Sequence, residues 1–344
     1  MKATQVPRES ASTDPATLLV SVQNFSLDLS PGREFLPVLT GVDMEVRKGE
    51  VVGLVGESGS GKSTLAMSLI GLVPQRISRR TSGSIQVVGV DVTEKHQRRV
   101  REIRGSRVGM IFQEPMTSLD PAFRVGDQIA EVIRRHKGGS RKAARLQAIE
   151  SLRLVEIADA ERRADSYPHE LSGGLRQRVS IALAIACRPD LLIADEPTTA
   201  LDVTTQAQIL ALLKRLRDEM GMAIILISHD LAVIAEFCDR ILVMYAGQIV
   251  EQAPIDPFFE RPLHPYSSAL LQSLPENQVP LVQLATLPGS PPPLGLTVDG
   301  CRFAARCAHM VHGRCDVAPI PLLGGGDRLH RCVRADELTL PGAQ

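Results

Sequence analysis

A glycine-rich segment carries the pattern of a nucleotide-binding loop. Residues 56–63, GESGSGKS, match G-x-x-x-x-G-K-[ST] between an apolar run at 51–56 and a helical pattern at 63–72. Glycines let backbone N–H groups approach phosphate oxygens, and the helix directs the positive end of its dipole at the anion. We expect Lys62 to bridge the β- and γ-phosphates of ATP and Ser63 to ligate Mg²⁺. A glycine-rich turn without a ligand is the alternative, which the matching context disfavours. The predicted ATP-binding residues here are Gly56, Glu57, Ser58, Gly59, Ser60, Gly61, Lys62, Ser63 and Thr64.

Two adjacent carboxylates follow a second apolar run. The run at 191–194, LLIA, precedes Asp195 and Glu196, which is the Walker B arrangement expected beside such a loop. Asp195 would hold Mg²⁺ through water, and Glu196 would orient or deprotonate the water that attacks the γ-phosphate. Alone, an Asp-Glu pair after a strand is more often a polar strand end. Beside the phosphate-binding segment, it predicts ATP hydrolysis.

Strands and helices that alternate along the chain must position these side chains. Besides 51–56, the apolar runs at 191–194, 223–227 and 240–244 predict buried strands, with helical patterns at 178–187 and 204–220. This alternation implies parallel β-α-β units and therefore an α/β fold. The segment 18–46 predicts antiparallel strands, and the polar segment 113–168 predicts a helical insertion.

The composition is that of a soluble globular protein. Hydrophobic residues make up 44% of the chain and charged residues 23%, which disfavours disordered and coiled-coil classes. The 39 basic and 39 acidic residues balance, and aromatic residues are only 3%, so no nucleic-acid partner is expected. Basic residues gathered at 76–107 are expected to form a solvated face rather than a nucleic-acid groove. The first sixteen residues lack a secretory h-region and no apolar run approaches ~20 residues, so a cytoplasmic chain is expected.

Residues 171–178, LSGGLRQR, resemble the signature motif of ABC (ATP-binding cassette) ATPases. Further motifs of that family follow in the expected order, namely Gln113 of the Q-loop, Asp202 of the D-loop and His229 of the switch. The resemblance implies an α/β phosphate-loop ABC ATPase core at 17–250, with an antiparallel β subdomain and a helical subdomain at about 114–170. Residues 1–16 are expected to be a flexible N-terminus.

The resemblance also implies a division of roles among these residues. Glu196, His229 and Lys62 would promote hydrolysis, and Gln113 would contact the γ-phosphate and Mg²⁺. The signature residues would cap the nucleotide that an opposite subunit holds, near the D-loop. The aromatic ring that stacks on adenine has one candidate, Phe35, for which a purely structural Phe is the alternative. The residues implied at that shared interface are Ser172, Gly173, Gly174 and Asp202.

Three stretches narrow the resemblance to ATPase subunits of oligopeptide and dipeptide importers, a group that includes nickel and glutathione importers. They are residues 111–121, residues 195–204 and the segment LHPY at 263–266. The implied partners are two integral-membrane permease subunits, a second ABC ATPase subunit, preferably a paralogue, and an extracytoplasmic solute-binding protein. The implied location is peripheral, on the cytoplasmic face of the inner membrane. One alternative is a non-transport ABC ATPase acting on nucleic acid or ribosomes, and another is a redox-sensing regulatory subunit.

The proline-rich residues 251–344 are expected to form a C-terminal extension with a cysteine cluster. Four cysteines are spaced C-x5-C-x7-C-x16-C in the last 44 residues, and short zinc-type C-x-x-C spacings are absent. The resemblance to the peptide-importer group implies a [4Fe–4S] cluster. Zinc, with three interleaved histidines, and unliganded thiols stay open as alternatives. The cysteines are Cys301, Cys307, Cys315 and Cys332.

Overall fold

The computed structural model describes residues 18–30, 32, 34–94, 98–113, 118–199, 201–274, 287, 289–296 and 298–343. The expected flexible N-terminus at 1–16 lies outside these ranges. So do residues 114–117, where the helical subdomain was expected to begin, and Ala200 in the predicted D-loop stretch.

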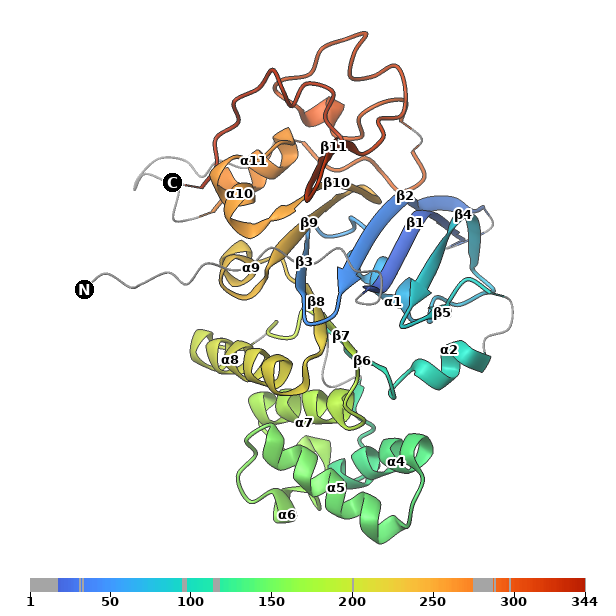
Figure 1. Ribbon diagram of the computed structural model, residues 1–344, viewed down its shortest axis with the longest axis vertical. Coiled ribbons are helices and arrows are strands. Elements are labelled where there is room, and N and C mark those ends of the chain that lie inside the picture. The colour runs from blue at the N-terminus through green and yellow to red at the C-terminus, as the bar shows by residue number, and fades with distance from the viewer. Residues whose placement is uncertain are drawn as a thin grey trace, which may run out of the picture.

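A four-stranded antiparallel sheet forms one side of the molecule (Figure 1). Its strand order is β2-β1-β4-β5, from β1 (Leu18–Leu29), β2 (Leu36–Arg47), β4 (Ser78–Val87) and β5 (Val90–Asp91). Strands β1 and β2 pair antiparallel, as the alternation at 18–46 predicted. Their apolar side chains, such as Val20 and Val46, are fully buried in one core with residues of the second sheet.

The second sheet has eight strands in the order β11-β12-β10-β9-β3-β8-β7-β6. Strands β3 (Val51–Val55), β8 (Ala223–Ile227), β7 (Leu191–Asp195), β6 (Val108–Ile111) and β9 (Arg240–Tyr245) are parallel. Every residue of β3, β7 and β8 is buried, because apolar runs without alternation suit strands covered on both faces. Their carboxyl ends meet at one edge, where doubly wound sheets bind ligands.

Helices cover this sheet and form a separate group at one end of the molecule. Helices α1 (Lys62–Leu69), α8 (Val203–Met220) and α9 (Leu231–Phe237) follow strands β3, β7 and β8 in the chain, and α2 (Arg98–Ile103) precedes β6. The predicted helical insertion contains α4 (Val125–Lys137), α5 (Arg141–Leu154) and α6 (Ala160–Arg163), which lie beside α7 (Gly173–Ile185) (Figure 1). Among the described residues, no helix is long and apolar enough to cross a bilayer.

The C-terminal extension continues the central sheet at the opposite end of the molecule (Figure 1). Strand β10 (Gln248–Pro254) runs through residue 250, where a boundary was expected, and pairs antiparallel with β9. The short strands β12 (Arg328–His330) and β11 (Leu323–Gly325) extend the sheet from β10. Helices α10 (Ile255–Glu260) and α11 (Pro265–Gln272) and the 3₁₀ turn η4 (Ala304–Arg306) complete the described extension.

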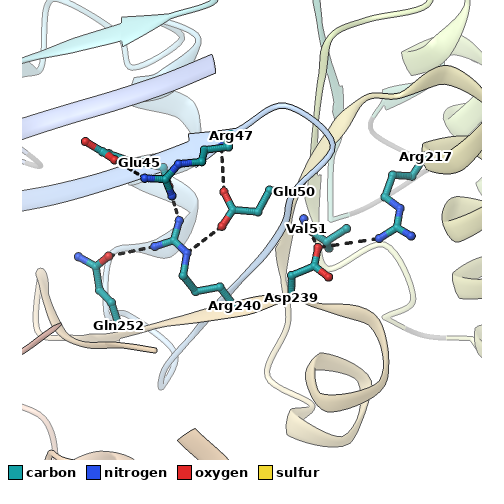
Figure 2. A network of polar contacts seen from close by, with 8 residues as sticks. All are labelled: Glu45, Arg47, Glu50, Val51, Arg217, Asp239, Arg240 and Gln252. Atoms are coloured by element: carbon teal, nitrogen blue, oxygen red, sulfur yellow. Dashed lines mark hydrogen bonds and ion pairs between the residues drawn. The ribbon is translucent and has the colours of Figure 1, made fainter. Parts of the chain in front are cut away.

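A polar network fixes the amino-terminal ends of β3 and β9, away from the phosphate-binding edge (Figure 2). The guanidinium of Arg240 donates to Glu50 Oε1 at 2.8 Å and to Gln252 Oε1 at 3.2 Å. The Val51 N–H donates to Asp239 Oδ2 at 2.9 Å. Because the Arg240 and Glu50 side chains are only 12% and 15% exposed, this pair is better shielded from solvent than a surface ion pair.

Replacing Arg240 by Leu should therefore lower the free energy of unfolding by about 2 kcal/mol, since it leaves the largely buried Glu50 carboxylate without its cation. Thermal and denaturant unfolding of the full chain measure the change. Arg98→Leu is the matched control, because the Arg98–Glu102 pair is 89% and 61% exposed and should contribute less than about 0.5 kcal/mol. Equal losses in both variants would contradict a stabilising role for the network.

Candidate functional site

The glycine-rich segment 56–63, here the phosphate loop, connects the carboxyl end of β3 to α1. Gly56 has φ of +150°, and a Cβ at that position would lie 2.0 Å from the Met244 carbonyl oxygen. Gly61 precedes α1 with φ of +102°, a conformation that L side chains rarely adopt. The glycines are thus required by the close packing of the loop against β9 and by its turn into the helix.

Lys62 is held inside the phosphate loop. Its ammonium donates to the carbonyl oxygens of Gly56, at 2.8 Å, and Glu57, at 3.0 Å. Burial lowers the pKa of Lys62, and this effect is opposed by the negative charges of Glu196, Asp195 and Glu57. The site therefore places one buried cation among three carboxylates, where an anionic phosphate can join it.

Asp195 ends strand β7, and its side chain lies close to Ser63 in the first turn of α1. Burial raises the pKa of Asp195, while a hydrogen bond from Ser63 lowers it. Its Oδ1 atom is buried and has no hydrogen-bond partner among the described residues. A hydroxyl and an orphaned carboxylate oxygen are the hard oxygen donors that Mg²⁺ prefers, so the residues present fit this ion.

Glu196 lies at the centre of a small hydrogen-bond network. Its Oε2 accepts from Gln113 Nε2 at 2.9 Å and from Thr199 Oγ1 at 2.8 Å. His229 Nδ1 is 3.5 Å from Glu196 Oε1. Partial burial opposes ionisation, but the hydrogen bonds and the His229 contact hold the pKa of Glu196 below its usual range. Glu196 also has φ of +48°, a strained conformation for a residue other than glycine and one that clusters at functional sites.

A cavity of about 420 Å³ brings most of the predicted residues together. Strand β8 lies between β3 and β7 in the sheet, so it separates the phosphate loop, which follows β3, from the Walker B carboxylates at the end of β7. The cavity is also lined by residues that the sequence did not single out, among them Leu294 of the extension. The predicted residues that line it are Gly56, Ser58, Gly59, Gly61, Lys62, Ser63, Thr64, Gln113, Glu196 and His229.

The signature and D-loop residues belong to other elements. Ser172 caps α7 by accepting the Leu175 N–H at 3.4 Å, and Gly174 is close to Thr205 of α8. Asp202 caps α8 through Thr205, whose backbone N–H and side chain lower the Asp202 pKa. None of the described signature residues lines the phosphate-loop cavity. Their contact with nucleotide stays a prediction.

Phe35 lies just before β2, and its side chain is 39% exposed. The Arg79 guanidinium sits over its ring, 4.7 Å from the centroid. Phe35 is not one of the described residues that line the phosphate-loop cavity. Adenine stacking on Phe35 stays a prediction.

The four C-terminal cysteines line one cavity of about 20 Å³, together with His264 and His309. Burial raises the pKa of Cys301 to about 12 and that of Cys332 to about 11. Among the described residues, no three His, Cys, Asp or Glu side chains converge as ligands for one metal ion. The grouping of the cysteines agrees with the sequence, whereas a ready-made metal site is not supported by the side-chain positions.

Two contacts at the phosphate loop were missed by sequence reasoning. The Glu57 N–H donates to Tyr266 Oη at 2.9 Å, and the Glu57 carboxylate pairs with Arg306. Tyr266 belongs to the segment LHPY, which we used only to identify the extension. Nothing in the sequence around Arg306 signalled its contact.

Comparison with known protein families gives two matches. Residues 39–199 match the model of the ABC transporter family. Residues 250–315 match the model described as oligopeptide/dipeptide transporter, C-terminal region. The first match covers most of the cassette expected at 17–250, and the second covers most of the extension expected at 251–344.

Individual proteins give the same relationship. A "Probable peptide ABC transporter ATP-binding protein" of Sinorhizobium fredii is 49% identical over 297 residues, covering 86% of this chain and 89% of that one. The oligopeptide transport ATP-binding protein AppD of Bacillus subtilis is 46% identical over 319 residues, covering 93% and 97%. Among solved structures, a dimeric ATP-binding cassette bound to ADP and Pi has a TM-score of 0.62 at 30% identity. It covers 69% of this chain and 99% of that one. The ABC transporter component cbiO1 of Clostridium perfringens has a TM-score of 0.60 at 28% identity, covering 71% and 91%.

Proposed function

The chain belongs to the ABC transporter family as an ATP-binding subunit of the oligopeptide/dipeptide transporter type, and from this premise we propose that it powers import of di- or oligopeptides. The observation that carries the proposal is the conjunction of two features in one chain. The first is the ATP site at the carboxyl edge of the parallel strands. The second is the extension that matches the C-terminal region of peptide transporters.

The residues of the site have distinct tasks in hydrolysis. Lys62 and the phosphate loop bind the β- and γ-phosphates, and Glu196 orients or deprotonates the attacking water. Gln113 and Thr199 hold the Glu196 carboxylate in place, and His229 approaches its other oxygen. Mg²⁺, held by Ser63, Asp195 and Gln113, would neutralise charge on the phosphates.

A second cassette is needed to complete the site. Ser172 and Gly174 begin α7 outside the cavity of their own chain, so they can cap only a nucleotide bound by another chain. Val203, beside Asp202, is 84% exposed, which suits an interface. The solved cassette with the TM-score of 0.62 is dimeric. We assign the partner as a paralogue of this chain, as the resemblance implies.

The helical insertion offers a surface for the permease subunits. A hollow of about 640 Å³ lies along α4 and the start of α5, and Phe123 at its rim is 58% exposed. Gln113 directly precedes this insertion in the chain, and its side chain donates a hydrogen bond to Glu196, the carboxylate assigned to the attacking water. Docking of a permease here, on the cytoplasmic face of the inner membrane, would transmit the presence of the γ-phosphate to the transport path.

Replacing Phe123 by Asp should abolish co-purification with the permease subunits, because it replaces the exposed aromatic ring of this otherwise largely polar hollow by a negative charge. Affinity purification of the assembled complex measures this. Leu146→Asp is the matched control, since Leu146 on α5 is 61% exposed but does not line the hollow. If Phe123→Asp assembles as well as Leu146→Asp, the docking surface is elsewhere.

Although the described side chains form no ready-made metal site, we propose that the four cysteines bind a metal centre once they rearrange, with [4Fe–4S] as its cluster. Four thiols line the same small cavity, of which Cys315 and Cys332 are buried and Cys301 and Cys307 are partly buried. Their wider, unequal spacing suits a cluster better than a single zinc ion. Thiols with raised pKa values release protons when a metal binds, so metal affinity should increase with pH.

Chain purified without oxygen should contain about four iron and four sulfide per polypeptide, with visible absorbance that Cys307→Ser removes. Elemental analysis and absorbance spectroscopy measure both. Cys187→Ser is the control, since Cys187 lies in α7's C-terminal flank outside this cavity. One zinc without iron would favour the alternative ligand, and a metal-free anaerobic preparation would contradict a metal centre.

Peptide transport and the alternative, a non-transport ATPase acting on nucleic acid or ribosomes, differ in what should stimulate ATP hydrolysis. In the assembled complex, ATPase activity should rise when peptide-loaded solute-binding protein is added, because closure of the cassettes is coupled to the permease. DNA or RNA should leave the rate unchanged. Stimulation by nucleic acid without a response to the loaded binding protein would favour the non-transport ATPase.

A further inference from the structure

Glu57 is a residue of the phosphate loop whose carboxylate lies in the hollow next to the phosphate-loop cavity, close enough to Lys62 for its negative charge to oppose the lowering of the Lys62 pKa by burial. Its own backbone oxygen accepts from Lys62, and its charge acts on the Lys62 ammonium. A carboxylate repels phosphate oxygens, and in a partly buried site this repulsion is screened less than in water. A second cation that neutralises Glu57 would therefore keep the Lys62 ammonium available for the phosphates.

Arg306 of the C-terminal extension is that cation. Its Nη1 donates to Glu57 Oε2 at 2.8 Å and its Nη2 to Glu57 Oε1 at 2.9 Å. This is the two-pronged pairing that planar guanidinium groups form with carboxylates. The Arg306 side chain is 6% exposed and that of Glu57 23%, so the pair is largely removed from water.

An aromatic cluster fixes the Arg306 guanidinium from behind. The Arg306 guanidinium carbon lies 5.8 Å from the ring centroids of both Tyr245 and Phe303, and Nη1 donates to Tyr245 Oη at 3.3 Å. Tyr266, whose hydroxyl accepts the Glu57 N–H, packs against the same two rings. The extension therefore holds both the backbone and the side chain of Glu57.

A second arginine of the extension supports the other side of the phosphate loop. Arg302 donates to the Ala246 carbonyl oxygen and, at 2.9 Å, to Thr40 Oγ1. The adjacent Gly247 N–H donates to the Ser60 carbonyl oxygen at 2.9 Å. The short segment 302–306 thus contacts the loop directly through Arg306, 249 residues away in sequence from Glu57, and indirectly through Arg302 and residues 246–247.

We propose that Arg306 is a positioning residue for ATP binding, which cancels the Glu57 charge and so makes the phosphate loop receptive to a triphosphate. This rests on the proposed function only in taking ATP as the ligand of the loop. Arg306 touches no reacting atom in this account. Its effect is on nucleotide affinity through Glu57, and the rate at saturating ATP stays near the parental value.

Nucleotide titration of the purified full chain tests the proposal. Arg306→Gln should weaken ATP binding about tenfold, which corresponds to about 1.4 kcal/mol. Glu57→Gln keeps the backbone N–H and carbonyl through which Glu57 serves the loop and removes only the side-chain charge, so it should bind ATP at least as tightly as the parent chain. The double variant should recover to within about threefold of the parent, because it has no charge left to cancel. Arg306→Lys, which keeps the charge but not the two-pronged geometry, should fall between parent and Arg306→Gln.

The recovery separates charge compensation from a merely structural role. If Arg306 only supported the fold, the second substitution would not restore affinity, and an unrelieved defect in the double variant overturns the proposal. Parental affinity in Arg306→Gln overturns it as well. Lys62→Met in the same titration distinguishes failure of this proposal from failure of the proposed function. If Lys62→Met bound ATP as tightly as the parent chain, the ATP site itself would be contradicted. Metal content measured in each variant shows whether the neighbouring Cys307 cavity has changed.

Discussion

Replacing Glu196 by Gln should reduce ATP hydrolysis by a factor of about 10² to 10⁴ while ATP still binds. The amide can accept the hydrogen bonds that Gln113 and Thr199 donate, so the geometry of the site is kept. It cannot accept a proton from the attacking water at neutral pH. Phosphate release by the assembled complex at saturating ATP measures the rate, and nucleotide titration measures binding.

Thr199→Val is the matched control for this prediction. It removes one hydrogen bond to Glu196 but leaves the carboxylate, so it should slow hydrolysis far less than Glu196→Gln. A Glu196→Gln complex that hydrolyses ATP at the parental rate would remove Glu196 from the mechanism.

The second large effect is expected at Lys62. Lys62→Met should weaken ATP binding by about 100-fold, or about 2.8 kcal/mol, because it removes the buried cation to which we assign binding of the triphosphate. Methionine has a similar length and suits a site where Lys62 is 8% exposed, so the fold should survive. Equilibrium titration with ATP measures the loss, and circular dichroism verifies folding.

Arg98, an exposed arginine that does not line the phosphate-loop cavity, provides the control for Lys62. Arg98→Met removes a cation whose side chain is 89% exposed and should leave ATP affinity unchanged. If Lys62→Met retains parental affinity, the phosphate loop does not bind nucleotide in the way described.

Much of the fold follows from local pattern. Strands β3, β7 and β8 were predicted because apolar runs on both faces suit a covered parallel sheet. Strand β4 was not predicted, since its sequence SRRTSGSIQV is polar over most of its length. Its pairing with β1 comes from backbone hydrogen bonds across the sheet, which leave no periodic signal in sequence.

The candidate site divides along the same line. The phosphate loop, Asp195 and Glu196 could be identified because each motif is local and has a fixed spacing. The partners of Glu57 could not, because Tyr266 and Arg306 are 209 and 249 residues away and meet it only in the folded chain. The left-handed conformation of Glu196 also has no sequence signal, since that region favours glycine.

The cysteines show a third situation. Their spacing predicted one shared centre, and all four line one cavity. The spacing favours a cluster over a C-x-x-C zinc site but does not by itself assign the metal, because ligand geometry and metal supply also decide it. Elemental analysis is therefore the step that assigns the centre.

The central claim, that this chain powers peptide import, is tested most directly by ATP-dependent uptake into proteoliposomes. The vesicles would contain both permeases and both cassettes, with solute-binding protein outside, ATP inside and a series of labelled di- and oligopeptides. We expect peptide to accumulate only with ATP, and Glu196→Gln in this chain to reduce accumulation in parallel with hydrolysis. Hydrolysis that the loaded binding protein stimulates, without accumulation of any peptide in the series, would contradict the claim.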